Sequence, residues 1–307
     1  MSKHILITGG TGFIGSALVP RLLQAGHTIT VLTRSPERAN RQFQNTVSAV
    51  SAVSAVSSLS DVTSPVDWLI NLAGEGIADK RWSDARKQAL RDSRIGLTES
   101  LVRWANDTDQ QFELVLTGSA IGIYGGFAGA HPSCDESSPL GNDFSANLCI
   151  DWEAAGEKLS NRAKRVVRLR TGLVLGPNGG MLSRMWLPFS FGLGGTIGQG
   201  EQVLSWIHIE DYLNAIDHLC SHSVSGAVNM TAPYPVSNAE FTAALASALK
   251  RPALLPMPTV MAKLAFGEMS ELLLRGQKVL PEALLRDEFT FRYPNVRQAL
   301  EQIASVW

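Results

Sequence analysis

The chain has 307 residues and a formal net charge of −1; 45% of its residues are hydrophobic and 18% are charged. This size allows one large α/β domain, or a nucleotide-binding domain with a smaller partner. The sequence has no basic cluster and no apolar run of about 20 residues, which argues against nucleic-acid-binding, anionic-membrane and membrane-spanning proteins. Its three cysteines are widely spaced and form no C-x-x-C pair. We therefore expect a reduced, cytoplasmic protein without a disulfide framework or a metal site.

The N-terminal residues have the order of a dinucleotide-binding βαβ unit. Residues 5–8 predict a strand, residues 9–15 read Gly-Gly-Thr-Gly-Phe-Ile-Gly, and residues 16–25 predict a helix that stops at Gly26. A glycine turn alone is weak evidence, but the strand before it and the helix after it supply the required context.

Each glycine of this turn has a physical task. We expect Gly10 to permit the tight turn, Gly12 to let the backbone approach a pyrophosphate, and Gly15 to let the helix pack closely on the sheet. The free N–H groups and the positive end of the helix dipole would then face the phosphates. The predicted cofactor contacts of the turn are Gly9, Thr11, Gly12, Phe13 and Ile14.

The end of the second predicted strand suggests which dinucleotide is bound. Residues 28–33 predict that strand, and Ser35 with Pro36 predicts a helix N-cap and first turn. An NAD site usually carries Asp or Glu here, whereas this chain has Thr33 and Arg34, which suit a 2′-phosphate. The alternative is a solvated arginine at the start of a loop. We favour NADP(H).

A Ser-Ala-Val repeat lies within residues 46–62 and matches neither the strand nor the helix period. The fold needs a third strand near here, so one valine-centred piece is expected to supply it. The rest is interpreted as a low-complexity expansion of a surface loop, without chemistry.

A buried-type strand over residues 66–72 runs into small residues. Ala73 and Gly74 would let a cofactor ribose approach the backbone, and Glu75 is either an acid beside the pocket or a cap for nearby amides. Residues 83–105 predict a helix. Its Arg94 points either toward the pyrophosphate or into a surface salt bridge.

The later elements complete an α/β pattern. Strands are predicted over 113–117 and 164–170, with a helix over 147–158 between them, which indicates a doubly wound parallel sheet. Glycines then break up residues 176–205. Further helices are expected from a capping box at Ser237-x-x-Glu240 to Leu249, near 259–275 and 281–286, and near 296–304.

These residues together resemble the extended short-chain dehydrogenase/reductase superfamily. Residues 8–15 match its cofactor turn, and Trp206-Ile-His-Ile-Glu-Asp211 resembles its segment entering the substrate region. More narrowly, the chain is similar to the atypical nucleoside-diphosphate-sugar epimerase-like family with a DUF1731 C-terminal segment. That likeness rests on residues 71–75, 79–82, 93–95, 188–195 and 229–233, and on segments from 251 to 294.

The resemblance implies a Rossmann domain over residues 1–175, to which 203–232 partly return, and a smaller substrate-side α/β region over 176–307. It implies binding of NADP(H), and it raises Arg94 above the salt-bridge alternative. The cofactor contacts that it implies are Thr33, Arg34, Leu72, Ala73, Arg94 and Leu173.

The superfamily's acid/base pair, Tyr-x-x-x-Lys, is absent. Cys149 replaces its tyrosine and Glu153 its lysine, and a carboxylate beside a thiol raises the thiol pKa. Ser119 would polarise a substrate carbonyl and Tyr124 would act as a substitute acid, or Tyr124 would only pack against the cofactor. Cys149 is either a nucleophile or a packed thiol, and His208 either orders a loop or faces a ligand.

Two hypotheses follow. The first is an NADP(H)-binding, epimerase-like oxidoreductase acting on an unidentified small molecule, such as a sugar nucleotide or a carbonyl compound. The second is a catalytically silent NADP(H)-binding protein that reports redox state to a partner. Either would act as a monomer or homodimer, without nucleic acid or membrane.

Overall fold

The structure is a computed structural model that describes residues 2–44, 53–129, 132–177 and 179–307. The chain divides into two compact units. The first comprises Met1–Ile77, Gln88–Ser119 and Ile150–Leu169, and the second comprises Ala78–Lys87, Ala120–Cys149 and Arg170–Trp307. Residues 78–87 and 120–149, which the sequence places in the first domain, thus group with the second unit.

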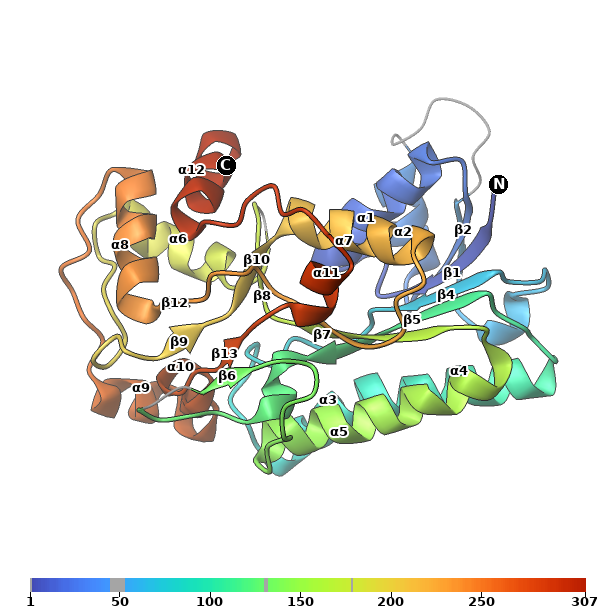
Figure 1. The fold of residues 1–307 in the computed structure, drawn as a ribbon, viewed down its shortest axis with the longest axis horizontal. Helices are drawn as coiled ribbons and strands as arrows, with labels where there is room; N and C mark the ends of the chain where they lie inside the picture. The colour runs from blue at the N-terminus through green and yellow to red at the C-terminus, as the bar shows by residue number, and fades with distance from the viewer. Residues whose placement is uncertain (1, 45–52, 130–131, 178) are drawn as a thin grey trace. The chain divides into compact units, whose positions relative to one another are not determined.

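A seven-stranded sheet of order β11-β7-β5-β4-β1-β2-β3 is the centre of the fold. The pairs β1–β2, β2–β3, β1–β4 and β4–β5 are parallel, as predicted. Within the first unit, α1 and α2 cover one face of the sheet and α4 covers the other (Figure 1). The strands are β1 (His4–Thr8), β2 (Thr28–Leu32), β3 (Val53–Val56), β4 (Trp68–Asn71), β5 (Leu114–Ala120), β7 (Val166–Thr171) and β11 (Gly226–Met230).

The central strands are apolar runs because helices cover them on both faces. Ile5, Leu6 and Ile7 of β1 are fully buried. The third strand comes from the valine-rich repeat, as predicted, since Ile29 pairs with Val53 in β3. The repeat residues up to position 52 lie outside the described part of the chain.

Local signals set the helix ends with mixed success. The stop after α1 (Phe13–Gln24) is confirmed, because Gly26 has a φ of 86° and its N–H donates to the Leu23 carbonyl. Pro36 opens α2 (Pro36–Phe43) and Ser35 occupies the N-cap position, as predicted, although its side chain makes no capping hydrogen bond. Helix α5 (Phe144–Glu157) starts three residues before the predicted position, because the Asp143 carboxylate accepts the Ala146 N–H at 2.8 Å.

The helix expected over residues 83–105 has a π-helical segment, Asp92–Gly96, between α3 (Asp84–Arg91) and α4 (Leu97–Asp107). Single π turns inside helices are frequently found at functional sites. Arg94 lies in this segment.

The second unit has its own apolar core, which includes Trp206, Phe241 and Leu300. The predicted capping box at Ser237 and Glu240 is confirmed. No helix within the described residues is long and apolar enough to cross a membrane. The helices of the second unit include α6 (Leu182–Ser190), α7 (Ile209–Ser221), α8 (Asn238–Leu249), α9 (Thr259–Phe266), α10 (Glu271–Leu274), α11 (Glu282–Arg286) and α12 (Val296–Val306). Its short strands are β6 (Ser133–Cys134), β8 (Leu173–Leu175), β9 (Val203–Leu204), β10 (Trp206–His208), β12 (Val236–Ser237) and β13 (Lys278–Val279).

Candidate functional site

The glycine turn after β1 packs directly against the backbone that follows β4. Gly9 has a φ of 72°, and a Cβ added to it would lie 2.7 Å from the Leu72 carbonyl carbon. The residue that needs the left-handed conformation is therefore Gly9, and the assignment of the tight turn to Gly10 is wrong. Gly10 instead makes room for a side chain, since a Cβ there would lie 2.9 Å from Val31.

Gly15 and Gly12 leave the first turn of α1 open. A Cβ on Gly15 would lie 2.2 Å from the Gly9 carbonyl oxygen, so no larger residue fits where the helix meets the turn. Gly12 is the N-cap and offers no side chain to the helix. The first N–H groups of a helix, including those of Phe13 and Ile14, have no acceptor within the helix. Together with the half-exposed Thr11, they form a surface that suits an anion.

A buried chain of hydrogen bonds holds the segment after β4 in place. The Thr8 hydroxyl donates to Asn71 Oδ1 at 2.6 Å, and Asn71 Nδ2 donates to Thr98 Oγ1 at 2.9 Å. The Ala73 N–H donates to Thr8 Oγ1 at 3.3 Å. The sequence interpretation missed this network, although a polar residue at the end of each of two apolar strands was the available signal.

Arg94 lies beside this segment. Its Nη2 donates to the Glu75 carbonyl oxygen at 2.9 Å, and a Cβ on Gly74 would lie 3.1 Å from its Cζ. The guanidinium also lies over the Trp152 ring, 5.2 Å from the centroid. The Glu75 N–H donates to Ser93 Oγ at 3.1 Å. The π turn thus places the positively charged Arg94 guanidinium at the carboxyl end of β4.

Thr33 and Arg34 follow β2 at the same edge of the sheet. The Thr33 N–H donates to the Val56 carbonyl at 2.9 Å, and its hydroxyl accepts the Ser35 N–H at 3.3 Å. Arg34 is exposed, and its guanidinium has no partner within the described residues. Its charge is therefore available to an external anion.

Ser119 and Glu153 form a buried pair at the end of β5. Ser119 Oγ donates to Glu153 Oε1 at 2.7 Å, and both residues are less than 9% exposed. Arg168 Nε lies 3.7 Å from the other Glu153 oxygen. Because Asn71 pairs with Thr117 in parallel strands, Ser119 lies at the same carboxyl edge as the segment after β4. The sequence predicted Ser119 as a site residue and missed its bond to Glu153, which comes from the following helix.

Tyr124 belongs to the second unit and has a fully engaged hydroxyl. It donates to Asn229 Oδ1 at 2.7 Å and accepts from Arg170 Nη1 at 2.9 Å. Burial raises the pKa of Tyr124 to about 12, although the neighbouring Arg170 opposes this shift. A phenol with this pKa and these partners is a poor proton donor near neutral pH. The contacts favour a structural role over the predicted acid.

The remaining candidates also lie in the second unit. His208 is the N-cap of α7, where its Nδ1 accepts the Glu210 N–H, and burial lowers its pKa. This matches its interpretation as a loop-ordering residue. Leu173, a predicted cofactor contact, lies in β8, and its N–H donates to the Ser205 carbonyl. Cys149 is buried in α5.

This geometry agrees with the comparison with known proteins. The model of the NAD dependent epimerase/dehydratase family matches residues 5–231. The chain belongs to this epimerase/dehydratase family. A second model, a domain of unknown function called DUF1731, matches residues 257–303. Both agree with the resemblance drawn from the sequence.

Relatives of the epimerase/dehydratase chain match along its length. Epimerase family protein Mb2239 of Mycobacterium bovis is 41% identical over 299 residues, covering 96% of each chain. The crystal structure of human epimerase family protein SDR39U1 (isoform 2) with NADPH has a TM-score of 0.85 and 32% identity, covering 99% of this chain and 100% of that one. The nucleoside-diphosphate sugar epimerase of Corynebacterium glutamicum has a TM-score of 0.75 and 30% identity, covering 100% of this chain and 59% of that one.

Proposed function

We propose that the first unit binds NADP(H) at the carboxyl edge of β1, β2 and β4. The observation that carries this proposal is the close approach of the glycine turn to the backbone after β4, where a Cβ on Gly9 would lie 2.7 Å from the Leu72 carbonyl carbon. The pyrophosphate would lie on the open first turn of α1, with Arg94 supplying a positive charge nearby. The relative solved with NADPH supports the same cofactor.

The 2′-phosphate of NADP(H) would bind Arg34. This arginine is exposed, and none of the residues 33–36 directly after β2 is acidic and able to accept from a 2′-hydroxyl. A titration of NADPH fluorescence tests the assignment. Arg34→Ala should weaken NADPH binding far more than NADH binding, whereas Arg41→Ala, at the other end of α2, should change neither. Equal losses for NADPH and NADH in Arg34→Ala would show that Arg34 does not bind the phosphate.

We further propose that the protein is an oxidoreductase or epimerase acting on a hydroxyl or carbonyl group of a small molecule. The bound nicotinamide would supply the hydride chemistry. The protein's own contribution would be the pair Ser119–Glu153, in which the serine hydroxyl already donates to a carboxylate at 2.7 Å. A substrate hydroxyl would donate its proton to Ser119 Oγ while the Ser119 proton moves to Glu153.

Turnover of NADPH or NADP⁺ with a panel of carbonyl compounds and sugar nucleotides tests this role. Glu153→Gln keeps the size of the side chain and removes the proton acceptor, so we expect a loss of about 10²- to 10⁴-fold in kcat. Glu157→Gln is the matched control, because Glu157 lies one turn later on α5 and pairs with Arg168 at 2.7 Å. Equal activity of the two variants would refute the relay.

A catalytically silent NADP(H)-binding protein is the second candidate. It is favoured by Cys149 and Glu153 at the places of the superfamily's tyrosine and lysine, and by the engaged hydroxyl of Tyr124. NADPH binding without turnover on any substrate of the panel would favour this function.

A further inference from the structure

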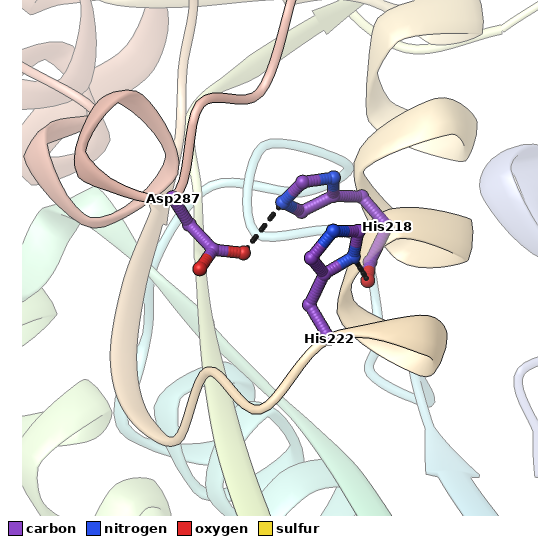
Figure 2. A group of neighbouring side chains, drawn as sticks. All are labelled: His218, His222 and Asp287. Atoms are coloured by element: carbon purple, nitrogen blue, oxygen red, sulfur yellow. Dashed lines mark hydrogen bonds and ion pairs between the residues drawn. The ribbon is translucent and has the colours of Figure 1, made fainter.

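Three side chains of metal-ligand type meet at the end of α7. His218 lies in the last turn of α7 and His222 is the extended residue that follows the helix, while Asp287 follows α11, 69 residues after His218 (Figure 2). One ligand atom from each lies within 4.8 Å of the others. The His218 Nε2 is 2.7 Å from Asp287 Oδ2, and the two imidazole rings stack with centroids 3.8 Å apart.

The backbone prepares the imidazole of His222 for a ligand. Its Nδ1 lies 2.9 Å from the His218 carbonyl oxygen and 3.3 Å from Ser221 Oγ, and because a carbonyl can only accept, the first contact is a hydrogen bond in the tautomer with the proton on Nδ1 (Figure 2). The lone pair of the neutral ring is then on Nε2. Histidines that bind metals usually donate their other ring N–H to a carbonyl or carboxylate in this way.

Asp287 is held on a tight turn. Its N–H donates to the Ala283 carbonyl, and the next residue, Glu288, has a φ of 60°. The ring of Phe289 packs edge-on against His218 with centroids 5.3 Å apart. The backbone that carries Asp287 is therefore held by a hydrogen bond, and the ring of His218 is held by an apolar contact, while the Asp287 side chain can move.

We propose that His218, His222 and Asp287 bind a divalent transition-metal ion of the zinc class. Two imidazole nitrogens exclude Mg²⁺ and Ca²⁺ as preferred ions, because those take oxygen ligands. A tetrahedral ion at about 2.0–2.1 Å from each ligand needs ligand atoms about 3.3 Å apart. The exposed His222 and the Asp287 side chain, which is 30% exposed, are free to move that far. Water would complete the coordination, and the ion would link the end of α7 to the turn after α11.

Zinc binding to the chelator-treated, untagged full-length protein tests the proposal by isothermal titration calorimetry. We expect one Zn²⁺ per chain and a higher unfolding temperature with Zn²⁺ than without it. His222→Gln and Asp287→Asn should each weaken zinc binding by about 100-fold, since even second-shell changes cost about 10- to 100-fold. Glu288→Gln removes a carboxylate one residue away from Asp287 and should bind zinc like the wild type.

His222→Gln is the decisive variant because it leaves the His218–Asp287 hydrogen bond intact. Zinc should raise its unfolding temperature much less than it raises that of the wild type. Absence of zinc binding by the wild type would overturn the proposal and leave only the hydrogen bond between His218 and Asp287. Wild-type affinity in Asp287→Asn would also overturn it, because the two histidines alone would then account for the binding.

Discussion

Removing the hydroxyl of Tyr124 separates the structural from the catalytic interpretation of this residue. In Tyr124→Phe, the fully buried Asn229 loses the hydroxyl that donates to its Oδ1. Arg170 Nη1 still donates a hydrogen bond to the Glu136 carbonyl oxygen at 3.2 Å. One buried acceptor is left without this partner, and one hydrogen bond to a cation is lost. We expect the free energy of unfolding to fall by about 2–3 kcal/mol, and the unfolding temperature by roughly 3–5 °C.

Denaturant unfolding and calorimetry measure this loss. Tyr234→Phe is the matched control, because Tyr234 is 63% exposed and its hydroxyl should contribute less than about 0.5 kcal/mol. In an Asn229→Ala background, Tyr124→Phe should cost less, because the acceptor that it would orphan is absent.

The same variant tests catalysis. If the hydroxyl is structural, the turnover number on any active substrate should change only a few-fold. Unchanged stability together with a loss of about 100-fold or more in kcat would refute the structural interpretation and restore Tyr124 as the acid.

Three further measurements test the fold and the site. Gly15→Ala should abolish NADPH binding and destabilise the protein, because its Cβ would lie 2.2 Å from the Gly9 carbonyl oxygen. The control Gly96→Ala should be neutral or slightly stabilising, because no atom lies within 4 Å of its Cβ. Equal effects of the two substitutions would contradict the close packing at Gly15. Burial raises the pKa of Tyr212 to about 12, above its unfolded value, so the unfolded state loses its proton first and stability should fall as the pH rises from 10 to 12. The difference in stability between wild type and Tyr212→Phe should shrink by about 1.4 kcal/mol per pH unit over this range, and a constant difference would contradict the shift. Ser119→Ala removes a donor to a buried carboxylate and should cost about 2 kcal/mol of stability, with circular dichroism melting as the measurement and an unchanged melting curve as the contrary result.

The cofactor region was largely predictable because its signals are local. A strand, a glycine turn and a helix follow one another within the first 26 residues. The sequence alone also shows that Arg34 stands where an NAD-binding protein usually has an acidic residue. Hydrophobic patterns identified the parallel sheet and its valine-rich third strand. Even here, the structure corrected the assignment of the tight turn, because Gly9 rather than Gly10 has the left-handed φ and lies against the backbone of Leu72.

The chemistry depended on contacts between distant residues. The bond from Ser119 to Glu153 joins residues 34 apart, and the bond from Tyr124 to Asn229 joins residues 105 apart. The spacing of His218 and His222 is visible in the sequence, but Asp287 reaches them only through the turn after α11. Sequence periodicity records which residues face the core along one element. It carries no information about which elements pack together, and that packing decides where a proton or a metal ion is held.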